Sequence, residues 1–250
     1  MKKQIQFLAI ALLAAALFTH CKNNPSPATA DGTASNGAAA AGYWVNKAWW
    51  EALQSTKSPH EASKHLGVAG VAVDQDSAGA WTAVVNYAFH EGMIYKLKAA
   101  DGPNFTLVNT EDSTVAHQFK FNADKTVFLD SFEMLRIGDA KMKEADYSGQ
   151  LLGGTYALKG GKADVVFGKD GSLTGLPGYA GFEVLYDYIE DQLAADELML
   201  IKSNTDGERD FYVFQAKGNQ LLLSTIEETM GKDSITVYKT GKVKYELTRK

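Results

Sequence analysis

The stretch VVFGKDGSL, residues 165–173, has the pattern of a tight β-hairpin. Val165 and Phe167 stand two positions apart, so their side chains share one face of a strand. Asp170-Gly171 is typical of two-residue hairpin turns, in which both central residues need positive φ. Leu173 then begins the returning strand. We therefore predict that Val165 and Phe167 lie in the core of an antiparallel sheet.

The same frame recurs four more times along the chain, in two close copies and two looser ones. They are Phe119/Phe121 with Asp124-Lys125 and Val127/Leu129, Tyr212/Phe214 with Lys217-Gly218-Asn219 and Leu221/Leu223, Tyr95/Leu97 with Asp101-Gly102 and Phe105/Leu107, and Ile235/Val237 with Thr240-Gly241 and Val243/Tyr245. Five hairpins of one design predict an all-β protein, built as an antiparallel meander.

The composition limits both the class of protein and its partners. The chain has 250 residues, is 45% hydrophobic and carries a net charge of -5, which suits one large β domain or two small ones. A mildly acidic chain without a basic run interleaved with aromatics argues against nucleic acid as a partner. The basic residues of the last predicted strand indicate a solvated face or a protected sheet edge, or else a contact with anionic headgroups. They are Lys239, Lys242, Lys244, Arg249 and Lys250.

The N-terminus has the pattern of an export signal. Lys2 and Lys3 precede the apolar run Phe7–Phe18, which is about as long as a signal-peptide core and too short to span a bilayer. Cys21, the single cysteine of the chain, follows directly. This arrangement resembles a bacterial lipoprotein signal, which implies that residues 1–21 are a signal peptide ending at a lipidated Cys21. The alternative is an ordinary secretory signal cut further along.

Residues 22–42 are rich in Ala, Asn, Ser, Gly and Pro. A segment of this composition buries too little apolar surface to offset the entropy lost on ordering. We therefore expect a flexible tether before the folded part, residues 43–250.

The folded part opens with a short strand at Tyr43–Val45, followed by two short helices. Asn46 is placed to cap a helix over Lys47–Gln54, and Ser58 begins a capping box with proline at the first helical position. Strands are expected from Val68 to the end, and the polar stretch Gly138–Gly149 is the best internal boundary. The chain is therefore either one enlarged barrel or two lobes, residues 43–137 and 150–250.

A family resemblance follows from these features. The start Gly154–Tyr156 followed by VVFGKDGSLTG and regular short strands resembles the lipocalin-like domains of bacterial envelope lipoproteins. The opening Tyr-Trp-Val-Asn with Thr56–Pro59 resembles uncharacterised lipoproteins of Bacteroidetes-type bacteria. The helical pair is similar to the cap in the fatty-acid-binding branch of the calycins. The resemblance implies a calycin-type closed barrel, with a helical cap after the first strand, that binds a small hydrophobic or amphipathic ligand.

Candidate ligand-binding residues are aromatic side chains with a few polar groups. His117 shares strand parity with Phe119 and Phe121, and Arg136 shares parity with Phe132 and Met134, so both are candidates to point inward. An inward arginine would suit a ligand carboxylate. The alternatives are that His117 is a hydrogen-bonded core residue and that Arg136 faces water at a strand end. The full candidate set is Trp44, Trp49, Trp50, Tyr87, Phe89, Tyr95, His117, Phe121 and Arg136. The tryptophans either seal one end of the barrel or wall a ligand site.

The sequence carries no hydrolase elbow, P-loop, dinucleotide fingerprint or HExxH zinc motif. We therefore expect a protein that is not an enzyme and that needs no cofactor or metal. The main hypothesis is a lipid-anchored envelope protein that binds or carries a small apolar ligand, attached to the outer membrane. The alternative is a structural or adhesion protein with a filled barrel whose loops bind protein or glycan. Lys22-Asn23-Asn24 lacks an acidic pair, which favours the periplasmic side over the surface.

Overall fold

The computed structural model describes residues 33–87, 91–142, 144–186, 193, 195–205, 207–230 and 236–250. The expected signal segment, Cys21 and the tether up to residue 32 lie outside the described residues, as does Phe89. The helices are α1 (Thr33–Ala40), α2 (Lys47–Thr56), α3 (Pro59–Ser63) and α4 (Glu144–Leu152). The first eight strands are β1 (Gly42–Asn46), β2 (Gly70–Gln75), β3 (Trp81–Tyr87), β4 (Glu91–Ala99), β5 (Phe105–Asn109), β6 (Ala116–Phe121), β7 (Val127–Leu129) and β8 (Phe132–Gly138). The next eight are β9 (Gly154–Leu158), β10 (Asp164–Phe167), β11 (Leu173–Thr174), β12 (Tyr179–Val184), β13 (Glu197–Lys202), β14 (Arg209–Lys217), β15 (Gln220–Met230) and β16 (Thr236–Arg249).

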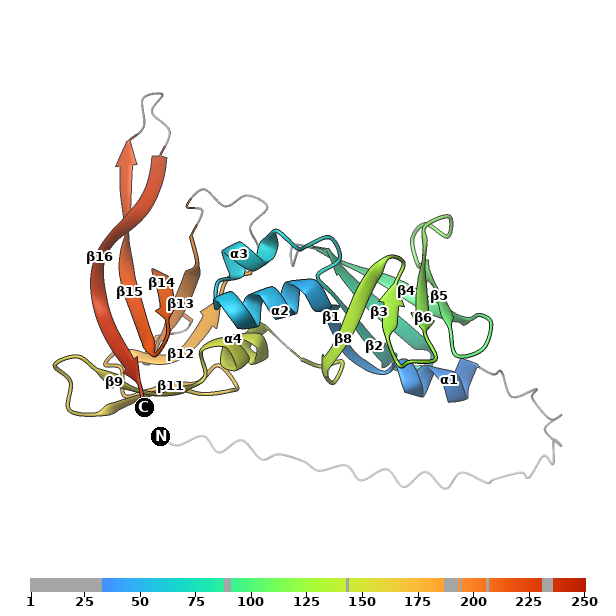
Figure 1. Ribbon diagram of the computed structural model, residues 1–250, viewed down its shortest axis with the longest axis horizontal. Helices are drawn as coiled ribbons and strands as arrows, with labels where there is room; N and C mark the ends of the chain where they lie inside the picture. The colour runs from blue at the N-terminus through green and yellow to red at the C-terminus, as the bar shows by residue number, and fades with distance from the viewer. Residues whose placement is uncertain are drawn as a thin grey trace, which may run out of the picture. The chain divides into compact units, whose positions relative to one another are not determined.

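Strands β1 to β8 form a closed antiparallel barrel in sequence order, with β8 returning to pair with β1 (Figure 1). Every one of the eight strands sends at least one buried side chain into the same apolar cluster. In an eight-stranded barrel the interior is just wide enough for side chains to fill it. The prediction of an antiparallel meander that closes into a barrel is confirmed.

Strands β9 to β16 form a second sheet with the same meander, again joining the last strand to the first through β9 and β16. Its two edge strands, β11 and β12, nearly meet. A bridge joins Ser172 to Gly181, and the N–H of Phe182 donates to the carbonyl of Gly171 at 2.8 Å. Val165 and Phe167 are buried in the core of this sheet, as the opening hairpin predicts.

The two sheets begin with the same local structure. In each, a helix ends in a turn closed by a backbone hydrogen bond, from Ala41 N–H to Gly37 in the first and from Gly153 N–H to Gly149 in the second. The aromatic residue seven positions after that glycine then hydrogen-bonds back to the helix. The indole N–H of Trp44 donates to the carbonyl of Ala40, and the hydroxyl of Tyr156 donates to that of Leu152, both at 2.8 Å.

The ends of the two sheets match as well. Arg136, near the end of β8, pairs with Trp44, and Arg249, at the end of β16, pairs with Tyr156. Both arginine side chains lie over the glycine that opens the first strand, Gly42 or Gly154. Four features shared in the same order make the chain two copies of one barrel module. We call the helix-bearing end of each module its closed end, and the opposite end its mouth.

Helices α2 and α3 form an insertion between β1 and β2 that the second module lacks. Both expected caps are present: the Asn46 side chain accepts the N–H groups of Ala48 and Trp49, and the Ser58 hydroxyl accepts that of Glu61. Three buried side chains of the insertion join the core of the second sheet, those of Trp49, Leu53 and Ala62.

A half-buried carboxylate also attaches the insertion to the second module. Oδ1 of Asp196, in the loop before β13, accepts the hydroxyl of Ser58 at 2.9 Å and the N–H of His60 at 2.8 Å. Burial raises the pKa of Asp196, against the two hydrogen bonds that favour its ionised form. The insertion thus belongs to the first module by sequence and to the second by packing.

The boundary expected at Gly138–Gly149 is confirmed, because the first sheet ends with β8 and α4 then leads into the second sheet. Two other expectations are wrong. Residues 33–40 of the expected tether form helix α1, whose alanines are strong helix formers. Thr240-Gly241 is no hairpin turn, because β16 runs without a break through it, with register shifts opposite Ser224.

Candidate functional site

Four side chains meet at the mouth of the first barrel, and we call them the mouth cluster: Tyr87, Tyr95, His117 and Asp130. Tyr87 is the last residue of β3, a strand whose first residue, Trp81, contacts α1 at the closed end. His117 is near the start of β6, and Asp130 follows β7. The meander therefore brings residues from four separate segments to the end of the barrel that α1 leaves uncovered.

The cluster is a continuous chain of hydrogen bonds. Nδ1 of His117 lies 2.6 Å from Oδ2 of Asp130, and Nε2 of His117 lies 2.6 Å from the hydroxyl of Tyr87. The two tyrosine hydroxyls are 3.0 Å apart, and that of Tyr95 lies 3.2 Å from Nε2. Oδ1 of Asp130 also accepts the N–H of Gln118 at 2.8 Å, so Asp130 is held in place by backbone as well as by the imidazole.

The protonation of the cluster follows from its geometry. An ionised carboxylate only accepts hydrogen bonds, so Nδ1 of His117 carries the proton and donates to Asp130. In neutral His117, Nε2 is then an acceptor for the tyrosine hydroxyls. Burial, followed by the hydrogen bond with Tyr95, raises the pKa of Tyr87 well above its usual range. Tyr87 therefore stays a neutral hydroxyl near neutral pH, suited to hydrogen bonding and unsuited to nucleophilic attack.

The barrel below the cluster is packed. The ring of Trp44 meets those of Phe119 and Phe121 edge-on at centroid distances of 5.6 and 5.9 Å, and the two phenylalanines are 5.3 Å apart. Above this floor, Met93 is 44% exposed, and its sulfur lies 3.7 Å from the Tyr95 hydroxyl. The mouth therefore offers a ligand one apolar side chain, Met93, beside the hydroxyl and imidazole groups of the cluster. The interior toward the closed end is filled by packed aromatic side chains.

The structure divides the sequence-predicted site residues among several places. Tyr87, Tyr95 and His117 meet at the mouth, and Trp44 and Phe121 lie deeper in the same barrel. Trp49 and Trp50 belong to the second core, so of the three tryptophans only Trp44 is inside the first barrel.

Two candidates do not join the mouth cluster. Arg136 pairs with inward-pointing Trp44 but is exposed at the closed end, where the register shifts, so the expectation of a buried inward arginine is wrong. Phe89 lies outside the described residues. The sequence pattern predicts neither Asp130 nor Met93 at the site. Asp130 has φ 52°, in a turn, and turn residues carry no strand parity that would reveal which way they point.

A comparable cluster occupies the mouth of the second sheet. The hydroxyls of Tyr179 and Tyr212 are 2.9 Å apart, Tyr179 donates to Oδ2 of Asp210 at 2.6 Å, and Nζ of Lys244 donates to Tyr212 at 2.6 Å. Burial and the hydrogen bond to Asp210 raise the pKa of Tyr179, and the bond to Tyr212 raises that of Lys244. Both modules thus end in a pair of hydrogen-bonded ring side chains with an aspartate.

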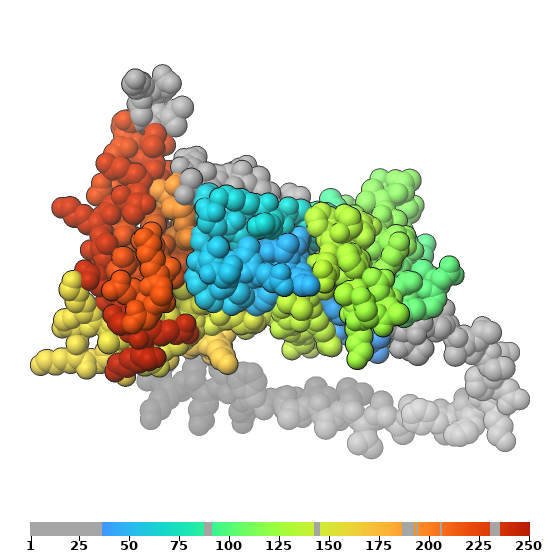
Figure 2. Space-filling view, in the orientation of Figure 1, coloured from blue at the N-terminus to red at the C-terminus, as the bar shows by residue number. Residues whose placement is uncertain are grey.

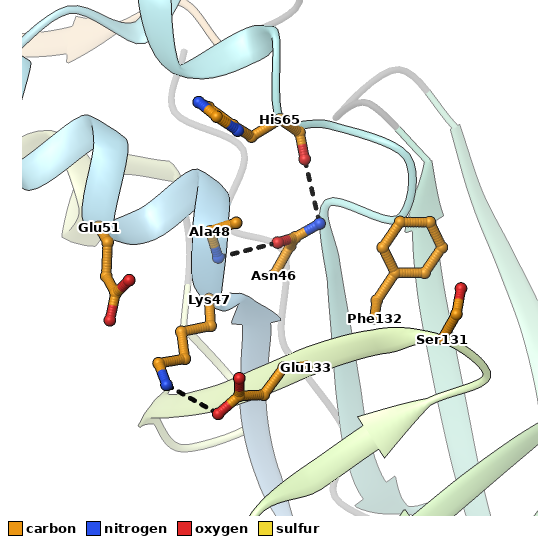
Figure 3. Close-up of a pocket in the computed structure, with 8 residues that line it drawn as sticks. All are labelled: Asn46, Lys47, Ala48, Glu51, His65, Ser131, Phe132 and Glu133. Atoms are coloured by element: carbon orange, nitrogen blue, oxygen red, sulfur yellow. Dashed lines mark hydrogen bonds and ion pairs between the residues drawn. The ribbon is translucent and has the colours of Figure 1, made fainter.

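Figure 3 shows a pocket of about 360 Å³ beside α2, at the turn into β8. Three of its polar side chains have partners. Nζ of Lys47 lies 2.7 Å from Oε1 of Glu133, and the Asn46 amide bonds Ala48, Trp49 and the carbonyl of His65. The side chains of Glu51, His65 and Ser131 also line the pocket. We rank it below the mouth cluster, in which four side chains form one continuous hydrogen-bonded network.

Two searches of the described residues give no further site. No three histidine, cysteine, aspartate or glutamate side chains within the described ranges converge as metal ligands. Within those same ranges, no helix has the length and hydrophobicity needed to cross a membrane. In comparisons with protein-family models, with curated proteins and with solved structures, nothing matched this chain.

Proposed function

We propose that this protein is a lipid-anchored, non-enzymatic binding protein of the cell envelope, and that it holds a small amphipathic molecule at the mouth of its first barrel. The observation that carries the proposal is the mouth cluster, in which two hydroxyls and an imidazole converge within 3.2 Å of one another. Binding sites commonly pair an apolar surface with a few such placed polar groups.

The packing of the barrel limits the size and position of the ligand. Trp44, Phe119 and Phe121 occupy the interior next to the closed end, so a ligand would lie across the mouth and not along the barrel axis. Its apolar part would contact Met93 and the His117 ring, and its polar group would exchange hydrogen bonds with Tyr87 and His117. A short chain or a single ring with a hydroxyl, carbonyl or carboxyl group fits this description.

The choice of binding over catalysis rests on the state of the polar groups. Tyr87 keeps its proton because its pKa is raised, and among the described residues the only hydroxyls that bond the His117 Nε2 are those of Tyr87 and Tyr95. Such a network orients and recognises a ligand, and it lacks the activated nucleophile that covalent catalysis requires.

Native mass spectrometry of the protein purified from its own envelope tests the proposal. We expect a co-purifying small mass on the wild type that is lost in His117→Gln, a variant of similar size that cannot bridge Asp130 and Tyr87. Lys98→Ala, an exposed change on the outer face of β4, is the control and should keep the mass. A mass that survives His117→Gln, or that Lys98→Ala also loses, would place the ligand elsewhere.

The anchor and location are tested separately. Cys21→Ser should move the protein from the membrane fraction to the soluble fraction of the envelope, because it removes the sulfur that would carry the lipid. A protein that stays with the membrane after this change would be held there by another route, and the lipid-anchor part of the proposal would fail.

The filled interior favours a second candidate function. Buried side chains from every strand meet in each module, which suits a rigid scaffold that presents loops and edges to a protein or a glycan. Native mass spectrometry that finds no small molecule bound to the wild type would support this second function over the first.

A further inference from the structure

Strand β16 is longer than the sheet that it belongs to. It pairs with β15 along its length from Thr236 to Thr248, but on its other edge it pairs with β9 only through residues 247–249. The β15–β16 ribbon therefore extends past the mouth of the second module, as Figures 1 and 2 show. Among the described strands, none pairs with the second edge of residues 236–245. Such an edge presents N–H and C=O groups that can pair with another chain.

The side chains along this edge carry positive charge. Lys239, Lys242 and Lys244 are all exposed within six residues of β16. Lys239 lies 3.5 Å from Glu227 on the neighbouring strand, and Lys244 bonds the Tyr212 hydroxyl. Like charges opposite one another destabilise a strand pair, whereas opposite charges support it. The lysines therefore oppose pairing of β16 with a second copy of itself and favour an acidic strand.

A groove of mixed lining lies beside the same edge. It has a volume of about 550 Å³, and its apolar part includes Leu158, at the end of β9, and Leu222 and Val243, on the outer face of β15 and β16. The ion pair of Lys159 and Glu246 lines its polar part. Val243 is 47% exposed. A strand added to β16 would continue the sheet at the place where β9 turns away, and one of its outward side chains would reach this groove.

We infer that the free edge of β16 binds an extended acidic segment of a partner protein by strand addition, with an apolar side chain of that segment in the groove formed by Leu158, Leu222 and Val243. In this mode backbone hydrogen bonds provide affinity, and pockets for alternate side chains provide specificity. The inference does not depend on the mouth cluster or on a small-molecule ligand.

The test uses the folded chain and two blocked synthetic peptides of about ten residues, the length needed to cover residues 236–245. In one peptide glutamate and threonine alternate around a central leucine, and in the other lysine replaces glutamate. We expect the acidic peptide to bind and to slow amide hydrogen exchange in residues 236–245, and the lysine peptide to do neither.

Three variants sharpen the test. Lys242→Glu should weaken binding of the acidic peptide by about tenfold or more, because it places like charges across the new pair. Lys217→Glu makes the same charge change at the closed end of the same sheet and should leave binding unchanged. Val243→Ser should weaken binding while it keeps the preference for the acidic peptide.

Several results would overturn the inference. They are a failure of the acidic peptide to bind at about 1 mM, equal weakening by Lys217→Glu and Lys242→Glu, and protection that appears outside β16. Dimers of the wild type that protect residues 236–245 would show that a second copy of the chain occupies the edge instead. Because Lys242 is exposed on the ribbon, the circular dichroism spectrum of Lys242→Glu should match the wild type.

Discussion

Nδ1 of His117 lies 2.6 Å from Oδ2 of Asp130, and this contact sets which nitrogen of the imidazole faces the tyrosines. Because Asp130 accepts a hydrogen bond from Nδ1–H, Nε2 is presented to Tyr87 and Tyr95 as an acceptor. The aspartate is thus the residue that orients the mouth cluster, although it reaches the mouth from a turn and not from a strand.

Asp130→Asn tests this role. The amide tolerates the positive φ of the turn and keeps an oxygen, but it removes the charge from the hydrogen bond to His117. We expect a loss of about 1–2 kcal/mol in the free energy of unfolding, or a fall in Tm of about 2–8 °C for a chain of this size. Urea denaturation measures the loss, and ¹⁵N shifts of His117 should show a change of tautomer. An unchanged tautomer would mean that Asp130 does not orient the ring.

The module repeat predicts a difference between two equivalent glycines. A Cβ on Gly149 would overlap the backbone carbonyl of Lys169, whereas one on Gly37 would meet the side chain of Trp81. Backbone cannot move aside as a side chain can, so Gly149→Ala should cost about 2–3 kcal/mol. Gly37→Ala should cost less than Gly149→Ala, because the Trp81 indole can shift where backbone cannot and the gain in helix propensity returns about 1 kcal/mol.

Chemical denaturation of both variants makes the comparison. The control is Gln150→Ala, an exposed change in α4, the helix that contains Gly149. Equal losses in Gly37→Ala and Gly149→Ala would show that Trp81 is held as rigidly as the backbone at Lys169. A loss in Gln150→Ala of the same size as in Gly149→Ala would show that the effect is one of helix stability and not of close packing.

The sequence predicts the hairpins best where a turn residue truly needs positive φ. Gly102, Gly171 and Gly218 have φ of 66°, 81° and 59°, and Lys125 has 70°, and all four of these hairpins are present. Gly241 has no positive φ, and a Cβ there would crowd the side chains of Thr225 and Glu227. A glycine that allows close approach looks the same in the sequence as one that makes a turn, and so the fifth hairpin is wrong.

The sequence predicts the site residues only where they lie in regular strands, because there the alternation of side chains shows which way each one points. Parity with Phe119 places His117 at the barrel interior, and Tyr87 and Tyr95 meet it there. Parity fails for Arg136, because a register shift beside Trp44 leaves it exposed at the closed end. The helical face that contains Trp49 is recognisable, but the sheet that it covers depends on tertiary packing, which no local pattern encodes.

Asp196 predicts an unusual response to pH where the insertion meets the second module. Burial raises the pKa of Asp196, so the folded state favours its neutral form. The stability from the neutral carboxyl is present below the pKa of about 3.9 in the unfolded chain, and it is lost as the pH rises through the raised pKa in the folded state. At neutral pH the charge on this half-buried carboxylate therefore destabilises the fold.

Asp196→Asn removes that charge and keeps an oxygen to accept from Ser58 and His60. We expect its Tm to exceed that of the wild type at pH 7 and the difference to shrink toward pH 4. Asp196→Ala removes both hydrogen bonds and should cost about 1–3 kcal/mol at every pH. Melting curves from pH 4 to pH 8 separate the two variants. A lower Tm for Asp196→Asn at pH 7 would mean that the hydrogen bonds to the ionised form outweigh the cost of burial.

The raised pKa values of the tyrosines at the two mouths predict how the stability of the fold falls at high pH. The pKa values of Tyr87 and Tyr179 are raised by burial and by their hydrogen bonds. The stability from the neutral hydroxyls is full below the pKa of about 10 in the unfolded chain, and it falls as the pH rises toward the higher pKa of the folded state. Each such tyrosine adds up to about 1.4 kcal/mol per pH unit to the slope of that fall.

Tyr179→Phe removes one of these groups, together with the hydroxyl that Asp210 accepts at 2.6 Å. We expect a loss of about 1–3 kcal/mol at pH 8, since a charged acceptor loses its donor, and a shallower decline between pH 9.5 and pH 11 in urea denaturation. Tyr238→Phe, on the ribbon away from the Tyr179–Asp210 pair, is the control for removing a tyrosine. If Tyr179→Phe leaves the alkaline slope as steep as in the wild type, the hydroxyl of Tyr179 ionises as readily in the fold as in the unfolded chain, and the mouth of the second module is wetter than its packing indicates.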